Sequence, residues 1–298
     1  MEKAIKDKTY RYDDAFKAKA RAHQFAFREN VLRDYYDEKN PQVILTPNAA
    51  QCGLIFCDIY RDLILKKIKK FGTSALFSNM LRSEHIPYNL FVPMEEDLES
   101  AKLFFNRIIG GGISNICHIY IEFAGHSNKE MYLNDGTSFD AYIEYLDDKN
   151  QRGGIGIEVK YTENGYPIGK KEEEDIRDTN SLYWTMTSKS EYFVSDLDVH
   201  IFLKAHHLRQ IWRNHLLGYS MICKGDIQHF HHIHLYPQGN FHFHQYAIPE
   251  YKSLLTQKGK DSFIDLTYES MFALLKQYFT SAKQRKWIDY LYQRYINM

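Results

Sequence analysis

The stretch SFDAYIEYLDDKNQRGGIGIEVKY, residues 138–161, contains two runs in which apolar and polar side chains alternate. A connection rich in Asp, Asn and Gly joins the two runs. Alternation with a period of two on both sides of such a connection predicts a β-hairpin with one buried and one solvated face. The apolar face would comprise Phe139, Ala141, Ile143 and Tyr145 in the first strand and Ile155, Ile157, Val159 and Tyr161 in the second.

The opposite face of the predicted hairpin carries the side chains that can perform chemistry. Asp140 lies on this face of the first strand, and Glu158 and Lys160 lie on it in the second, because alternate residues of a strand point the same way. If the register brings the polar faces together, two carboxylates and an ammonium group meet there, which suits a divalent metal ion with a cation beside it. The plainer alternative is a cross-strand ion pair on an exposed sheet, contributing under about 1 kcal/mol.

An Asp near the start of one strand, followed by Glu-x-Lys in the next, resembles the PD-(D/E)xK nuclease superfamily. Asp140 and the tripeptide Glu158-Val159-Lys160 occupy the matching positions, whereas Phe139 stands where the superfamily usually has Pro. More of the chain is similar to a group of bacterial proteins described as type II restriction endonucleases. The similar stretches are SEHIPYNLF (83–91), FDAYIEY (139–145), IEVKYTE (157–163), RQIWRNHLL (209–217), LYPQGN (235–240) and WIDYLYQRY (287–295).

The resemblance implies an α/β fold with a restriction-endonuclease-like core in the order αβββαβ and a central mixed sheet flanked by helices. The sequence can supply this order with a helix at 95–109, strands at 116–123, 138–146 and 154–161, a helix at 208–221 and a strand at 230–236. We expect one elaborated domain over 1–298, which such a length and an apolar fraction of 44% allow. Its parts would be a helical N-terminal region (1–94), a catalytic core (95–247) and a helical C-terminal region (248–298).

The resemblance also assigns roles to residues. Asp140, Glu158 and the backbone carbonyl of Val159 would hold Mg²⁺, for which Mn²⁺ would substitute, and Lys160 would orient or help to deprotonate the attacking water. Glu84, on a short helix expected at 75–85, is a candidate for a further catalytic acidic group, although an exposed helical Glu is an equally good interpretation. Arg82, Gln210 and Arg213 are the candidates for contacting substrate phosphates, since a guanidinium fork suits phosphate oxygens.

Composition restricts the kind of partner. Lys plus Arg and Asp plus Glu both number 38, so the chain has no global positive field, and nucleic-acid binding must come from local patches. The four cysteines include no C-x-x-C pair and are too sparse for a disulfide framework, which favours a reducing compartment. The N-terminus is charged and no run approaches a membrane span. We therefore expect a cytoplasmic protein without a membrane partner.

A second conspicuous stretch is QHFHHIHLYPQGNFHFHQ, residues 228–245. Histidines two apart on adjacent strands can converge on one zinc ion, so a histidine-based metal site is one interpretation. We favour the other, in which PQGN is a turn between two alternating strands and histidine serves as an aromatic side chain with a polar edge. The histidines concerned are His229, His231, His232, His234, His242 and His244.

The function expected from these features is that of a metal-dependent DNA endonuclease, of the restriction type or a related defence nuclease, acting on double-stranded DNA. Two alternatives remain open: a DNA-binding protein that keeps the fold without cleavage, and a metal-binding protein built on the histidines of 229–244. We also expect a homodimer, because one Asp and one Glu-x-Lys cut one strand, and a double-strand break needs two such sites. Aromatic-rich segments near both ends of the chain could form core or interface.

Overall fold

A five-stranded mixed sheet forms the centre of the computed structural model, which describes residues 10, 12–35, 42–68, 75–165, 168–198 and 200–296. The strands follow one another in sequence order across the sheet. The pairs β1–β2 and β2–β3 are antiparallel, and β3–β4 and β4–β5 are parallel. The strands are β1 (Asn115–Phe123), β2 (Phe139–Leu146), β3 (Arg152–Val159), β4 (His229–Tyr236) and β5 (Phe263–Thr267).

The predicted hairpin is β2 and β3. Its turn is closed by Asp147, whose Oδ1 accepts hydrogen bonds from the backbone N–H groups of Lys149 and Gln151, both at 2.8 Å. Asn150 in this turn has a φ of 58°, a left-handed conformation that Asn adopts more readily than most residues. The register that results pairs Ala141 with Ile157.

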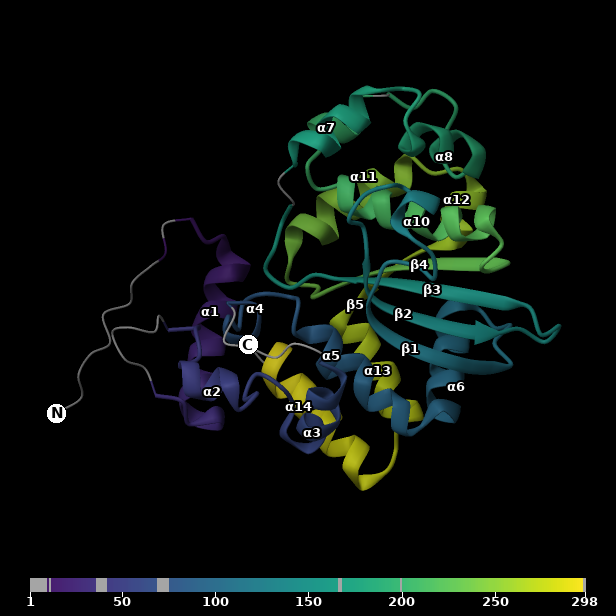
Figure 1. Cartoon of the computed structure of the whole chain (residues 1–298). Helices are drawn as coiled ribbons and strands as arrows, with labels where there is room; N and C mark the ends of the chain where they lie inside the picture. The colour runs from purple at the N-terminus through teal and green to yellow at the C-terminus, as the bar shows by residue number, and fades with distance from the viewer. Residues whose placement is uncertain are drawn as a thin grey trace.

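Helices cover both faces of the sheet (Figure 1). On one side lie α7 (Lys170–Arg177), α8 (Leu182–Ser190), α9 (Ile201–Lys204), α10 (Arg209–Lys224), α11 (Ile248–Ser253) and α12 (Gln257–Ser262). On the other lie α5 (Ile86–Phe91), α6 (Leu98–Ile109), α13 (Tyr268–Tyr278) and α14 (Ala282–Tyr295), with α1 (Ala15–Phe27), α2 (Pro47–Gln51), α3 (Arg61–Lys67) and α4 (Ala75–Ser78) at one end. Short 3₁₀ segments, Asp58–Tyr60, Val92–Glu96 and Lys129–Met131, and π-helical turns, Arg28–Leu32 and His242–Ala247, complete the elements.

The hairpin has no solvated face, contrary to the expectation from its alternation. Tyr142 is fully buried and Glu144 is only 6% exposed, because Phe123 and Phe139 stack on the ring of Tyr142 and His126 pairs with Glu144. Small residues in β3 make the space: a Cβ on Gly154 would lie 2.2 Å from the hydroxyl oxygen of Tyr142, and one on Gly156 would lie 2.4 Å from the ring of Phe139. Aromatic rings from β2 therefore lie over the glycines of β3.

Helix α10 packs on β4 through a glycine. A Cβ at Gly218 would lie 2.0 Å from the buried ring of Phe230, so the helix can approach the strand only with glycine at this position. The helix ends at Gly225, whose φ of 85° is the left-handed conformation common at helix C-termini. Eleven of its sixteen residues are buried, which makes α10 a central element of the structure.

The predicted αβββαβ order is confirmed by α6, β1, β2, β3, α10 and β4, with additional helices before and after it. Several local expectations are wrong. The C-terminal region contains a strand, β5, and residues 242–245 form part of a π-helical turn where a strand was expected. The helix expected at 75–85 ends at Ser78, and Glu84 lies in a turn, while Pro87 lies in the first turn of α5, where proline is well tolerated.

Among the described residues, no helix has the length and apolar character needed to cross a membrane.

We expect Gly218→Ala to destabilise the fold by about 1–3 kcal/mol, the usual cost of overpacking a well-filled core. The direction is diagnostic, because Gly→Ala inside a helix is otherwise favourable by about 1 kcal/mol. Urea unfolding measures the effect. Gly165→Ala is the matched control, since a Cβ there meets no atom within 4 Å. Unchanged or higher stability of Gly218→Ala would show that Phe230 can move aside.

Candidate active site

Asp140 and Glu158 meet at one end of the β2–β3 ladder. The last pair of the register is Ala141 with Ile157, so the next residues outward, Asp140 and Glu158, also lie opposite each other. The backbone N–H of Val159 donates a hydrogen bond of 2.7 Å to Oδ2 of Asp140. The two carboxylates are thus brought together by ordinary antiparallel pairing.

Lys160 forms the third corner of this site. Its Nζ lies 2.6 Å from Oε1 of Glu158 and donates a hydrogen bond of 2.6 Å to Oε1 of Gln210. The side chain of Glu158 is only 1% exposed and that of Lys160 is 13% exposed, so the ion pair is largely removed from water. A buried pair of this kind depends on further hydrogen bonds for its stability.

Helix α10 supplies those hydrogen bonds from its first turns. Gln210 accepts from Lys160, and Nδ2 of Asn214 donates to Oε2 of Glu158. These two side chains are four residues apart, so they lie on one face of the helix. Asn214 was not among the predicted site residues, since an amide within a helix carries no signal that distinguishes it from any other.

The backbone of Lys160 is held from two further elements. Its N–H donates to the carbonyl of Leu235 in β4 at 2.8 Å, and its carbonyl accepts from the hydroxyl of Tyr268 in α13 at 2.7 Å. Residues more than 70 positions apart in the chain therefore fix this one position. The lysine lies where β3, β4 and α13 come together.

The charges of the site strongly influence one another. Burial and the negative charge of Glu158 raise the pKa of Asp140 well above its usual range, despite the opposing effect of Lys160. Burial opposes the charge on Lys160, but Glu158 and Asp140 outweigh it and raise the pKa of the ammonium group. Lys160 is therefore a cation at neutral pH. The charged form of Asp140 is disfavoured unless a further positive charge lies nearby.

Glu122, at the end of β1, is a fourth charged group that sequence reasoning did not place in the site. Its φ of 56° is unusual for a bulky residue and occurs next to Phe123, which pairs with Phe139 of β2. Burial of the carboxyl group, together with the charges of Glu158 and Glu84, raises the pKa of Glu122 to about 7. The residue as a whole remains exposed, and contact with water moderates this effect. Its polar position at the end of an apolar strand was the only sequence signal.

Arg82 and Glu84 lie near this group and bind each other. The guanidinium of Arg82 donates hydrogen bonds to Oε1 of Glu84, one of them at 2.7 Å. The backbone N–H of the intervening Ser83 donates to Glu163, just beyond β3. Glu84 was predicted to lie near the acidic site, and its negative charge does contribute to raising the pKa of Glu122. Its role in catalysis stays a prediction.

Arg213 is held in a buried network. Its guanidinium pairs with Asp135 at 3.1 Å and with Glu172 of α7 at 2.8 Å, and the residue is 8% exposed. Burial raises the pKa of Asp135, but Arg213 outweighs this and keeps it below the usual value. Arg213 thus joins α10 to α7 and to the loop before β2. The predicted phosphate contact would require at least one of these pairs to exchange.

A recess of about 190 Å³ opens beside the carboxylates. It is lined by Gly136, Thr137, Ser138, Gln210, Arg213 and Asn214. Gln210 and Asn214 are the residues that bind Lys160 and Glu158, so the recess borders the ion pair directly. Its lining is polar, as a recess that admits a phosphate group requires.

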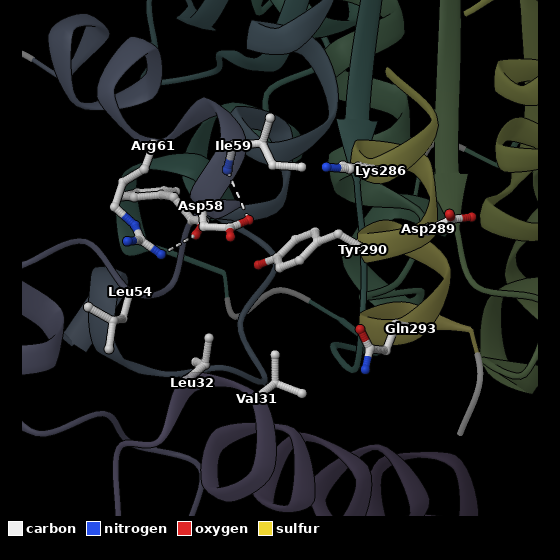
Figure 2. A pocket seen from close by; sticks show the side chains of 11 residues that line it. Val31, Leu32, Leu54, Asp58, Ile59, Arg61, Lys286, Asp289, Tyr290 and Gln293 are labelled. Carbon is white, nitrogen blue, oxygen red and sulfur yellow. Dashed lines mark hydrogen bonds between the residues drawn. The ribbon is translucent and has the colours of Figure 1, made fainter. Parts of the chain in front are cut away.

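A larger cavity, of about 570 Å³, lies elsewhere, between α14 and the segments around residues 31 and 54–61 (Figure 2). Figure 2 shows Asp58, Arg61 and Tyr290 around it. None of its lining residues is a candidate catalytic residue. Size therefore does not identify the active site of this protein.

The donor set of the site suits a hard divalent ion that keeps most of its own water ligands. Oε1 of Glu158 is buried and pairs with Nζ of Lys160, and Oδ2 of Asp140 accepts a hydrogen bond from the backbone of Val159. In the described part of the chain no three His, Cys, Asp or Glu residues form a group that could hold a metal ion. The site thus offers two carboxylates, which fits Mg²⁺ better than an ion that needs a complete protein cage.

Two of the four histidines of β4, His232 and His234, are buried, and the histidines of the described residues do not converge on a metal site. His232 and His234 have no exposed surface, and neither ring nitrogen of His234 has a hydrogen-bond partner among the described residues. Burial lowers the pKa of His232 to about 3 and also lowers that of His234. Both rings are therefore neutral at physiological pH. They pack as aromatic groups, His232 stacking on Phe263 of β5.

We expect Asp140→Asn to stabilise the metal-free protein at neutral pH. Because the folded-state pKa of Asp140 is raised, its contribution to stability is fully present below about pH 4 and is lost as the pH rises through the folded-state pKa. Asn removes this loss and can still accept from Val159. The gain in the free energy of unfolding should be on the order of 1 kcal/mol at neutral pH and vanish in acid. Urea unfolding as a function of pH measures it.

Asp147→Asn is the control of opposite sign. Backbone N–H groups lower the pKa of Asp147, so its contribution is present at neutral pH and is lost in acid. That variant should lose stability at neutral pH. Equal stability of wild type and Asp140→Asn across the pH range would contradict the electrostatic description of the site.

The family model of the PD-(D/E)XK nuclease superfamily matches residues 11–297 of the chain. No curated protein and no solved structure matches it. The matched region includes the central sheet, the flanking helices and the Asp140, Glu158 and Lys160 group described above. Proteins of this superfamily are generally nucleases and typically use divalent metal ions. The chain belongs to the PD-(D/E)XK nuclease superfamily.

Proposed function

We propose that the protein is a metal-dependent DNA endonuclease that hydrolyses phosphodiester bonds, of the restriction type or a related defence nuclease. One observation carries the proposal: Asp140, Glu158 and Lys160 lie together, with the lysine 2.6 Å from a buried glutamate. Apolar residues of similar volume would often be at least as stable as a buried ion pair, so the pair favours a functional role over a purely structural one. Membership of a nuclease superfamily supports the same activity.

In this proposal Asp140, Glu158 and the carbonyl of Val159 hold Mg²⁺, with Mn²⁺ able to replace it. When bound, the ion supplies a positive charge that stabilises the phosphoryl oxygens and a coordinated water of lowered pKa. The ion would also relieve the repulsion between the two carboxylates, which burial accentuates. The repulsion between the carboxylates therefore favours binding of a divalent cation at this site.

Lys160 would act as a fixed cation. Its raised pKa argues against the role of general base, since a protonated amine has no lone pair to accept a proton. The hydrogen bond to Gln210 and the ion pair with Glu158 hold the ammonium group beside the carboxylates. From there it can orient the attacking water and offset the negative charge that develops in the transition state.

DNA would reach the site over the recess beside α10. Gln210 lines the recess and can exchange its bond to Lys160 for one to a phosphate oxygen. Arg82 is the more available of the two candidate arginines, since its side chain is 50% exposed while Arg213 is paired with two carboxylates. We further propose that the whole chain acts as one domain in the cytoplasm and that its substrate is double-stranded DNA.

The two other functions considered have less support. A histidine-based metal protein would require the histidines of 229–244 to converge, and the described residues contain no such group. A DNA-binding protein without activity would have no need for the buried Glu158 and Lys160 pair beside Asp140. Neither alternative is favoured by a specific observation.

We expect Asp140→Ala or Glu158→Ala to abolish Mg²⁺-dependent cleavage, with losses of at least about a hundredfold, because each removes a charge that acts on the transition state. Lys160→Ala should lower kcat more than it changes DNA affinity. Cleavage of a labelled duplex by untagged protein measures these effects, and circular dichroism checks the fold.

His232→Ala is the matched control, since it alters a buried polar residue of the neighbouring strand that has no proposed role in the chemistry. Any loss of activity in this variant should follow loss of stability alone. Full activity of Asp140→Ala or Glu158→Ala would refute the site. Background activity in a folded His232→Ala protein would mean that the histidines had been misjudged.

We also propose that the protein acts as a homodimer, at least on DNA. Opposite strands of a duplex run in opposite directions, and a two-fold axis presents two identical sites with matched polarity. Mixing wild type with Lys160→Ala should therefore convert part of the double-strand breaks in a plasmid into nicks, because a mixed dimer has one active site. Agarose gels separate the nicked and linear forms.

Linear product that falls only in proportion to the wild-type dose, without nicked circles, would contradict an exchanging dimer. Light scattering with and without a short duplex then distinguishes a monomer from a dimer that does not exchange subunits.

A further inference from the structure

The segment that follows β4 returns to the catalytic end of β3. Because β3 and β4 are parallel, the C-terminal ends of both strands lie at the same edge of the sheet. Asn240 fastens the segment there, since its Nδ2 donates to the carbonyl of Tyr161 at 3.1 Å, and Tyr161 directly follows Lys160. The π-helical turn His242–Ala247 begins two residues after this anchor. Isolated π-helical turns occur often at functional sites.

Two aromatic side chains at this turn are exposed to solvent, Phe241 directly before it and Tyr246 within it. Phe241 is 56% exposed and Tyr246 is 63% exposed, whereas Phe243 and Ala247 pack into the core. Hydrogen bonds in a π-helix join residues five apart, so Phe241 and Tyr246 lie on nearly the same side of the turn. Phe241 directly follows the anchor Asn240, so the exposed rings belong to the segment that is fastened to the residue after Lys160.

We propose that Phe241 and Tyr246 form a stacking surface for nucleobases of an unpaired strand that leads to the scissile phosphate. The proposal rests on the proposed nuclease function and specifies the state of its substrate at the cut: double-stranded DNA that is locally opened, so that one strand is unpaired beside the scissile phosphate. A base can stack on an aromatic ring only when its face is free of neighbouring bases, and such stacking is independent of sequence. The rings would thus hold the strand without reading its sequence.

The shape of the catalytic recess supports an unpaired strand. The recess of about 190 Å³ leads to carboxylates and a lysine that are themselves nearly buried. A single strand can bend its backbone into such a recess while its bases rest on the rim, whereas a regular duplex must first be distorted to do so. Continuity with the site through Asn240 and Tyr161 is the reason to assign the rings to nucleic acid and not to a protein partner.

The test compares binding and cleavage. In the Asp140→Asn background with Mg²⁺, fluorescence anisotropy with a labelled oligothymidylate and with a duplex of equal length measures affinity. We expect Phe241→Ala and Tyr246→Ala each to weaken binding of the single strand by roughly tenfold, as loss of one stacked base does. Phe241→Trp should restore it. Cleavage by the otherwise wild-type chain should show a raised KM with little change in kcat.

Leu103→Ala is the matched control, because Leu103 is 53% exposed and lies on α6, on the other side of the sheet (Figure 1). This inference would be overturned if the wild type cleaves but the Phe241→Ala/Tyr246→Ala protein binds the single strand with unchanged affinity. The proposed function would then remain intact. A change in sedimentation without a change in nucleic-acid affinity would assign the rings to a protein contact and also overturn it. Absence of both cleavage and binding in the wild type would remove the inference together with the proposed function.

Discussion

The placement of Asp140 opposite Glu158 is the constraint on which the structure of the site depends. Burial and the repulsion between the two carboxylates raise the pKa of Asp140. Lys160 provides the compensating charge within the protein, at 2.6 Å from Glu158. Two hydrogen bonds from α10 stabilise this buried pair: Asn214 donates to Oε2 of Glu158, and Gln210 accepts from the ammonium group of Lys160. A hairpin alone could not maintain it.

The surrounding fold supplies that support. Helix α10 brings both amides from one face and reaches the sheet closely because it carries Gly218 against Phe230. The peptide groups of Lys160 are bound by β4 on one side and by Tyr268 of α13 on the other. Layers on both faces of the sheet thus converge on one short stretch of β3. The position of the lysine is consequently a property of the complete fold.

The sequence predicted the parts of this account that rest on strong local patterns. Strict alternation placed the hairpin and its acids correctly. The histidine-rich alternation after β4 was misinterpreted: Phe and His alternate over residues 241–244, but the structure exposes Phe241 and buries Phe243 and Ala247, which lie four residues apart as in a helical turn. Strand β5 was missed because five residues between two helices give too short a signal. The burial of Arg213 by two carboxylates depends on tertiary contacts that no spacing reveals.

The measurement that tests the central claim most directly is digestion of several supercoiled plasmids by the untagged wild-type protein, with Mg²⁺ and with a chelator. The account predicts cleavage that requires Mg²⁺ and returns when the ion is restored, because the acid pair needs a divalent cation to act on a phosphodiester. Discrete fragments would further indicate sequence recognition, and a smear would indicate its absence. Cleavage that persists in the chelator, or no cleavage under any divalent ion by folded protein, would contradict the account.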